Sequence, residues 1–240
     1  IERRYDENKR IVWYRYLDAD GVPMAVKNII ELEQGFDEYG NVNREIILDG
    51  QGNRALHPEN WCEHDIVYNE SKQKLSERWY GVDGAPILYK NSYSGIDRAF
   101  DEAGNVTRET YYNDKGQVGA NGGGVIVIER KYDENKRVVW YGYYDADDAP
   151  MAVKGIWQAR QGYDDAGNLN QEIMLDGDFD AAGLVTLERS ADGSVSAVTT
   201  NVVAVNTLAA RVLERAVAQT AEEKITVNIP LGNLMGSTLL

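Results

Sequence analysis

Polar turn residues interrupt this chain at a regular interval, and short runs of apolar and β-branched residues fill the segments between them. An aromatic residue followed by an acid or amide recurs every 31 or 32 residues, at Tyr5, Phe36, Tyr68, Phe100, Tyr132 and Tyr163. A cluster of turn-forming residues begins 13 residues after each aromatic, at positions 18, 49, 81, 113, 145 and 176. The constant spacing marks the stretch between landmarks as a rigid element. The sequence therefore predicts six repeats over residues 1–177.

Each repeat has the pattern of a β-hairpin. Gly40 and Gly104 stand where a tight turn needs a positive φ, and an Asp at the turn entry can bond its own backbone. In repeats 1 and 5 we expect Asn8 and Asn135 to take over the left-handed conformation, since Asn adopts it more readily than most residues. Strands rich in β-branched and aromatic residues follow the turns. A short third strand is expected after the second turn, at 23–26 and 150–153.

Position along the strands predicts what is buried. The last two residues of the second strand are apolar or aromatic in all six repeats, which favours a sheet covered on both faces at that end. Two residues earlier, four repeats carry an acid, at Glu45, Glu77, Glu109 and Glu172. Stacked carboxylates repel, so a solvated face is expected there.

Residues 4–50 and 131–177 align without gaps, with 30 of 47 positions identical. The offset of 127 residues equals four repeats. Both stretches should therefore adopt the same fold.

The rhythm stops after Gly177, and residues 178–240 show a different pattern. We expect a hairpin over 185–199, a helix over about 206–223 with Asn206 as its N-cap, and a strand over 225–229. The predicted fold is thus mainly β: tandem antiparallel β-hairpin repeats in an elongated sheet or solenoid over 1–177, then a small α+β segment (ββαβ) over 178–240. That segment is a candidate cap for the open edge of the array.

Composition narrows the possible partners. The chain has 240 residues and a net charge of −14, which argues against nucleic acid and anionic membrane as partners. One cysteine excludes an internal disulfide framework, and no apolar run is long enough to span a bilayer. The chain starts at Ile1 without a signal peptide, which suggests an excised fragment.

Candidate chemistry is sparse. His57, Cys62 and His64 are the soft metal ligands, and Glu59 or Glu63 could complete a set, but their spacing is irregular, so we expect no metal site. The acidic turns 18–21 and 145–148 lack the full pattern of an EF-hand loop. No nucleophile, base and stabiliser come together, so we expect no catalytic residue, no cofactor and no enzyme.

Aromatic residues are the better functional lead. A row of aromatic rings on a rigid sheet can stack on sugar rings, and the equivalent repeats offer such rings. The interpretation we favour over sugar stacking is that these rings belong to the core, because repeat proteins bury aromatics between repeats. The candidate glycan-stacking residues are Trp13, Tyr14, Trp140, Tyr141 and Trp157.

The segments 163–169 and 100–106, with the motif Tyr/Phe-Asp-x-Ala-Gly-Asn-Leu/Val, resemble the tyrosine–aspartate repeats of RHS-type bacterial surface and toxin-shell proteins, and also repeats in Gram-positive surface proteins. This resemblance covers residues 1–177 and implies a non-enzymatic surface scaffold or adhesion-type protein. Its implied location is the cell surface, and its implied partner is a cell-wall glycan or another surface protein. A glycan- or cell-wall-binding module is the alternative function.

The run from Asn228 to Ser237, with Asn206 to Leu208 opening the predicted helix, resembles the YunB-type sporulation protein family over about 178–240. That resemblance implies an endospore-forming source. It also implies the alternative of a sporulation-associated protein in the forespore or mother-cell envelope.

Overall fold

The computed structural model describes residues 1–175, 181–189, 195–200 and 226–228, with side chains up to residue 175. No helix occurs within these ranges, and among them no segment qualifies as a helical membrane span. The helix predicted over 206–223 lies outside them. The strands are β1 (Glu2–Tyr5), β2 (Ile11–Arg15), β3 (Glu31–Phe36), β4 (Val42–Leu48), β5 (Glu63–Tyr68), β6 (Lys74–Tyr80), β7 (Gly95–Phe100), β8 (Val106–Tyr112), β9 (Val127–Tyr132), β10 (Val138–Tyr144), β11 (Gln158–Tyr163), β12 (Leu169–Leu175), β13 (Ala181–Arg189), β14 (Val195–Thr200) and β15 (Thr226–Asn228).

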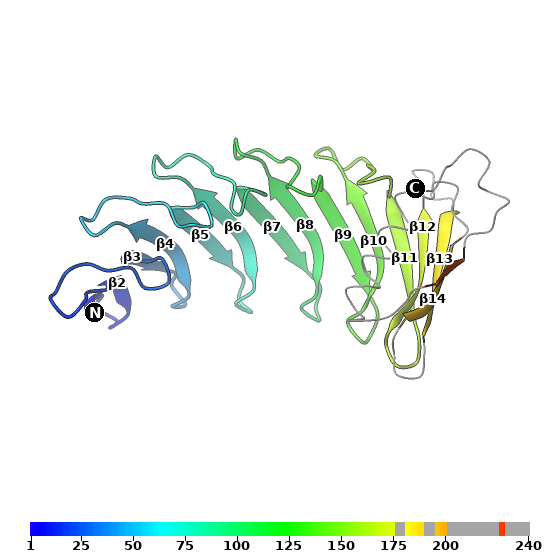
Figure 1. The fold of residues 1–240 in the computed structure, drawn as a ribbon, viewed down its shortest axis with the longest axis horizontal. Coiled ribbons are helices and arrows are strands. Elements are labelled where there is room, and N and C mark those ends of the chain that lie inside the picture. The colour runs from blue at the N-terminus through cyan, green and yellow to red at the C-terminus, as the bar shows by residue number, and fades with distance from the viewer. Residues whose placement is uncertain (176–180, 190–194, 201–225, 229–240) are drawn as a thin grey trace. The chain divides into compact units, whose positions relative to one another are not determined.

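The first twelve strands form six hairpins, one for each predicted repeat. Each odd-numbered strand lies beside the even-numbered strand that follows it, and a short turn joins the two (Figure 1). A longer connector then leads from the even-numbered strand to the next hairpin. The predicted β-hairpin repeat fold is therefore confirmed.

The chain divides into two compact units, residues 1–127 and 128–240. In the N-terminal unit the strands follow one another in chain order from β1 to β8. In the C-terminal unit the order is β9 to β14 with β15 added parallel to β14. The backbone of β13 to β15 confirms the hairpin and the strand predicted there. The domain boundary predicted after residue 177 stays a prediction.

The first turn of each hairpin is fixed by local hydrogen bonds. Asp37 Oδ1 accepts the N–H groups of Tyr39 at 3.0 Å and Asn41 at 2.8 Å, and Gly40 has a φ of +83°. The turns predicted from Asp and Gly are thus confirmed.

The prediction that Asn8 and Asn135 adopt the left-handed conformation was wrong. That conformation falls on the next residue, the equivalent of Gly40, which is Lys9 (φ 63°), Lys72 (φ 61°) and Lys136 (φ 61°) in repeats 1, 3 and 5. The turn geometry therefore overrides the residue preference, at a cost of about 1–2 kcal/mol for each lysine.

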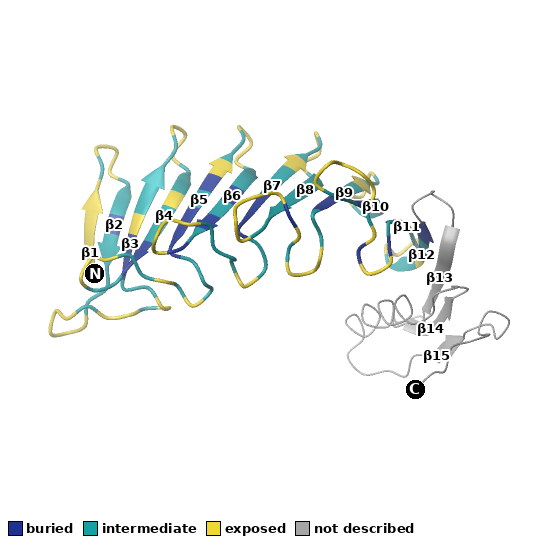
Figure 2. Cartoon of the chain, turned by 90° about the horizontal axis from the view of Figure 1, so that it is seen from above, coloured by how far each residue is buried: buried dark blue, intermediate teal, exposed yellow. Residues whose placement is uncertain are grey.

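The core lies at the end of each hairpin that meets the connectors. From β3 onward, buried residues occupy the start of the odd-numbered strands, and they lie toward the end of β4, β6, β10 and β12, as the dark segments of Figure 2 show. Leu32, Ile47 and Ile96 are at most 3% exposed. Burial of each such side chain contributes about 1.5–3 kcal/mol.

The connectors turn back onto the even-numbered strands instead of forming third strands. After its second turn the chain makes the isolated bridges Leu17–Pro23 and Tyr144–Pro150, and Met24 N–H donates to Tyr16 O at 3.1 Å. The third strands predicted at 23–26 and 150–153 are therefore reduced to isolated bridges, two in each segment, because Val26 and Val153 also bridge to Ile29 and Ile156. Only the first residues of each segment pair toward the preceding strand, while Val26 and Val153 pair within the connector, so no continuous strand is added to the sheet.

Candidate functional site

Trp13, the first predicted glycan-stacking residue, is covered on its strand. Its side chain is 6% exposed, and its Nε1 donates to Glu31 Oε2 at 3.2 Å. The guanidinium carbons of Arg4 and Arg15 lie 4.3 and 5.2 Å from the ring centre. Cations therefore hold the positions over the ring that a sugar would need.

Tyr14 and Tyr141 point to the opposite side of their strands from the neighbouring tryptophans, because successive strand residues alternate. Tyr141 is 5% exposed, and its hydroxyl donates to Glu172 Oε1 at 3.1 Å. Tyr14 is half-buried, packs edge-on against Tyr16, and burial raises the pKa of its hydroxyl to about 12. The predicted set is thus split between two faces.

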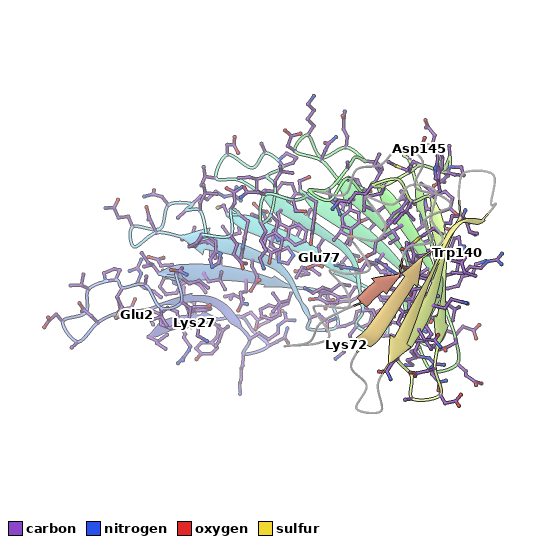
Figure 3. All side chains as sticks on the ribbon, turned by 45° about the vertical axis from the view of Figure 1, so that its right-hand side comes forward. Glu2, Lys27, Lys72, Glu77, Trp140 and Asp145 are labelled. Carbon is purple, nitrogen blue, oxygen red and sulfur yellow. The ribbon has the colours of Figure 1, made fainter. Side chains whose placement is uncertain are left out.

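Trp140 and Trp157 are half-buried. Trp140, labelled in Figure 3, donates from Nε1 to Gln158 Oε1 at 3.2 Å, and Lys131 Nζ lies 4.9 Å from its ring centre. No single face carries all five predicted rings. Glycan stacking by this set stays a prediction.

The histidine and cysteine side chains considered as metal ligands each make contacts of their own and do not converge on one point. His57 Nδ1 accepts the Glu59 N–H at 3.2 Å, and the buried Cys62 thiol points to Ile47 O at 3.6 Å. Within the described residues, no three His, Cys, Asp or Glu side chains are grouped to hold a metal ion. The acidic turns bind their own backbone, as Asp18 Oδ1 does with the N–H groups of Asp20 and Val22.

The row of acids predicted to be solvated is buried or half-buried, so that prediction was wrong. Glu77 and Glu172 are 6% and 5% exposed, and Glu45 and Glu109 are half-buried. The acids do not simply repel one another, because donors from neighbouring strands reach them. In repeat 6, Glu172 accepts hydrogen bonds from Gln161 Nε2 at 2.8 Å and from Tyr141.

In repeat 3 the partners of this acid are cations. Glu77 on β6 (Figure 3) accepts from Lys74 Nζ at 2.8 Å and from Arg98 Nη1 at 2.7 Å, and its Oε2 lies 3.1 Å from His64 Nε2. His64 also faces Glu45 Oε2 at 3.9 Å. The cluster therefore joins strands β4 to β7 of one sheet.

The cluster shifts the pKa of both central groups. Burial raises the pKa of Glu77, but the hydrogen bonds from His64, Lys74 and Arg98 outweigh it, so the pKa falls far below its ordinary value of 4.5. Burial lowers the pKa of His64, but its hydrogen bonds to Glu45 and Glu77 raise it above 6.5. The arrangement favours a carboxylate beside an imidazolium.

Aromatic rings stand beside the cluster. Trp79 is stacked between His64 and Tyr89, each with ring centres 4.7 Å apart and planes 7° apart. Tyr93 meets Trp79 edge-on at 5.4 Å. A cavity of about 270 Å³ opens here, and it is lined by Glu59, Trp61, His64, Lys74, Glu77, Trp79, Tyr89 and Tyr93. We call it the repeat-3 cleft.

The sequence analysis missed this cleft, although the repeats themselves held the signal. The position of His64, four residues before the landmark aromatic, is apolar in the other five repeats: Ile1, Leu32, Ile96, Ile128 and Ala159. The position of Lys74, six residues after it, is likewise apolar: Ile11, Val42, Val106, Val138 and Leu169. Both departures fall in one repeat and line one cavity. Comparing the repeats position by position would have found it.

The strands and turns define a β-hairpin repeat protein. No protein-family model matches the chain, and no curated protein matches it. The resemblance to the YunB-type family thus gains no support.

Similar solved structures include the crystal structure of TcdB2-TccC3-TEV, with 15% identity and a TM-score of 0.43 over 69% of this chain and 7% of that one. The crystal structure of TcdB2-TccC3 without its hypervariable C-terminal region has 13% identity and a TM-score of 0.36 over 80% and 10%. A Photorhabdus luminescens Tc holotoxin pore has 10% identity and a TM-score of 0.29 over 83% and 14%. The chain spans about a tenth of the length of these proteins.

Proposed function

We propose that the hairpin repeats act as a non-enzymatic scaffold, an extended spacer or adhesion-type element at a bacterial cell surface. One observation carries the proposal: the same turn and the same hydrogen bonds recur in successive repeats. Asp37, Asp101 and Asp164 each accept the N–H of the residue four positions on at 2.8 Å. An enzyme concentrates its special geometry in one place, whereas a scaffold repeats it.

The contacts between hairpins support a mechanical role. Arg10 of the first turn reaches the next turn, with its guanidinium carbon 4.6 Å from the Phe36 ring centre. Arg137 does the same at Tyr163, at 4.8 Å. Each hairpin is marginal alone and is stabilised by its neighbour, so force is passed from repeat to repeat.

Pulling the full chain from its ends tests the scaffold role. A repeat of 31 or 32 residues releases about 110 Å of chain at roughly 3.6 Å per residue. A spacer should yield several steps of that size. One abrupt release of the whole chain at low force would contradict it.

The surface location needs a separate test. Brief protease treatment of intact source cells should remove the repeats while a cytoplasmic marker survives. Protection of the repeats in intact cells, with cleavage only after lysis, would reject the surface part of the proposal.

A further inference from the structure

We propose that the repeat-3 cleft binds a carboxylate-bearing sugar ring, a uronic acid unit, with the Lys74 ammonium group on the carboxylate and the Tyr93 hydroxyl on the ring. This site goes beyond the scaffold function. The proposed site is tested independently of the pulling and protease experiments, because it lies in one repeat and does not depend on the contacts that all repeats share.

The first support is the departure of repeat 3 from its own pattern. His64 and Lys74 replace residues that are apolar in every other repeat, and both meet at Glu77. His64 stands at a buried position, where a polar group costs stability unless it is paired, and Lys74 stands at a half-buried one. Two such replacements lining the same cavity are expected at a functional site, because functional sites are where sequences depart from the hydrophobic pattern of the fold.

The second support is the balance of donors and acceptors. The carboxylates of the cleft are occupied: Glu77 by His64, Lys74 and Arg98, and Glu59 by the Tyr89 hydroxyl at 3.2 Å and Lys90 Nζ at 3.0 Å. The free capacity is therefore donor capacity. A ligand for this cleft has to bring acceptors.

Lys74 supplies the charged donors. Its ammonium has three N–H groups, Glu77 is its partner among the described residues, and its side chain is 43% exposed. A ligand carboxylate can thus reach it without breaking the bond to Glu77. The overall charge of −14 opposes binding weakly, because charges more than about 8 Å away are screened at physiological salt.

Tyr93 supplies a neutral donor and an apolar edge. Its hydroxyl has no hydrogen-bond partner among the described residues, and burial raises its pKa, so it stays protonated. Its ring is held edge-on between Trp79 and Tyr111, at 5.4 and 5.3 Å. A sugar ring combines hydroxyl acceptors with apolar C–H faces, which suits such a wall.

The size of the cleft favours a single ring. About 270 Å³ lies below the range of roughly 300–1,000 Å³ that is typical of sites for drug-sized ligands. A free cation is disfavoured because the acidic groups already hold Lys74, Arg98 and Lys90.

The test is to titrate the full chain separately with glucuronic acid, glucose and acetate at neutral pH. Binding is measured by calorimetry or by changes in amide chemical shifts. Lys74→Val restores the repeat residue, so it should fold, and it should weaken glucuronate binding by about tenfold, the loss of one charge-assisted hydrogen bond. Tyr93→Phe removes one hydroxyl and should weaken it several-fold. The matched control, Lys72→Gln, removes the same charge from the adjacent exposed turn and should leave binding unchanged.

Selective, saturable binding of glucuronate that is lost in Lys74→Val and kept in Lys72→Gln supports the proposal. Equal binding of acetate and glucuronate would overturn the assignment of a sugar, and equal binding of glucose would overturn the role of the carboxylate. Absence of saturable binding, or full binding by Lys74→Val with native circular dichroism, would overturn the site itself.

Discussion

Replacing Glu77 by Gln removes the single carboxylate on which three basic side chains of the N-terminal unit converge. Glu77 has a side chain 8% exposed, and it bonds His64, Lys74 and Arg98. Removing one partner of a buried ion pair typically costs about 3–5 kcal/mol.

The expected cost of Glu77→Gln is lower than this typical value, because its partners have other contacts. Lys74 is 43% exposed and can turn to solvent, while Arg98 also faces Glu109 at 3.6 Å and His64 also faces Glu45 at 3.9 Å. We therefore expect Glu77→Gln to lower the free energy of unfolding of the N-terminal unit by about 2–4 kcal/mol.

Glu45→Gln is the matched control. Glu45 occupies the same place in repeat 2, its side chain is 28% exposed, and its nearest ionisable partner is His64 at 3.9 Å. The Glu45–His64 contact is longer than the contacts of Glu77, and its carboxylate is more exposed, so we expect Glu45→Gln to cost only about 1 kcal/mol. Urea unfolding followed by circular dichroism, with hydrogen exchange of the Trp79 amide, measures both variants.

The pH profile gives a second readout of the same substitution. The pKa of Glu77 is lowered in the fold, so its contribution is present above 4.5 and is lost as pH falls toward the folded value. The pKa of His64 is raised, so its contribution is present below 6.5 and is lost as pH rises through the folded value. Groups facing this pair include Glu45, Lys74 and Arg98. The N-terminal unit should thus be most stable between about pH 4.5 and 6.5.

In Glu77→Gln the acid limb of this profile should shrink, and the alkaline limb should weaken because His64 keeps one carboxylate instead of two. A variant with wild-type stability and a wild-type pH profile would refute the view that the cluster stabilises the sheet.

Three further outcomes are expected. Lys9→Gly should raise the melting temperature, because Gly relieves a positive φ at a net gain of about 0.5 kcal/mol, and Gly40→Lys should lower it. Cys62 is fully buried and burial raises the pKa of its thiol, so a thiol reagent should label it only as fast as the protein opens; rapid labelling of native protein would contradict this. Ile96→Val should cost about 0.5–1.5 kcal/mol in urea unfolding, and a neutral result would mean that the site is not close-packed.

The repeat fold could be predicted from the sequence because its signals are local. An Asp that accepts backbone N–H groups within four residues, followed by a Gly with a positive φ, acts inside one turn. The 13-residue spacing fixes the distance to the next turn. Neither depends on what lies across the sheet.

The burial of the acids could not be predicted in the same way, because it depends on side chains from other strands and on connectors. Glu77 is neutralised by His64, 13 residues away, and by Arg98, 21 residues away. The stacked ring of Tyr89 comes from a connector. The register of three strands and the path of the connector had to be known first.

The two aligned stretches, 4–50 and 131–177, show which polar contacts the fold itself requires. In the first, Trp13 Nε1 bonds Glu31, and Glu31 also accepts from Arg15 Nε at 2.6 Å. In the second, the equivalents of Glu31 and Arg15 are Gln158 and Gly142, so the acid and its cation have changed together.

The hydrogen bond from the indole N–H is kept despite the substitution, since Trp140 Nε1 donates to Gln158 Oε1 at 3.2 Å. The Trp140 ring also lies within 3.0 Å of where a Cβ on Gly142 would stand, close to the space that an arginine side chain would enter. The hydrogen bond from the tryptophan Nε1 is thus kept in both stretches. Its acceptor is an acid paired with an arginine in the first stretch and an uncharged glutamine in the second. Losing the arginine alone would have left Glu31 buried without its cation, which is the costly state, so the two positions have to change as a set. The same logic applies to repeat 3, where His64 and Lys74 accompany Glu77, so that here too the partners of the acid differ from the other repeats as a set.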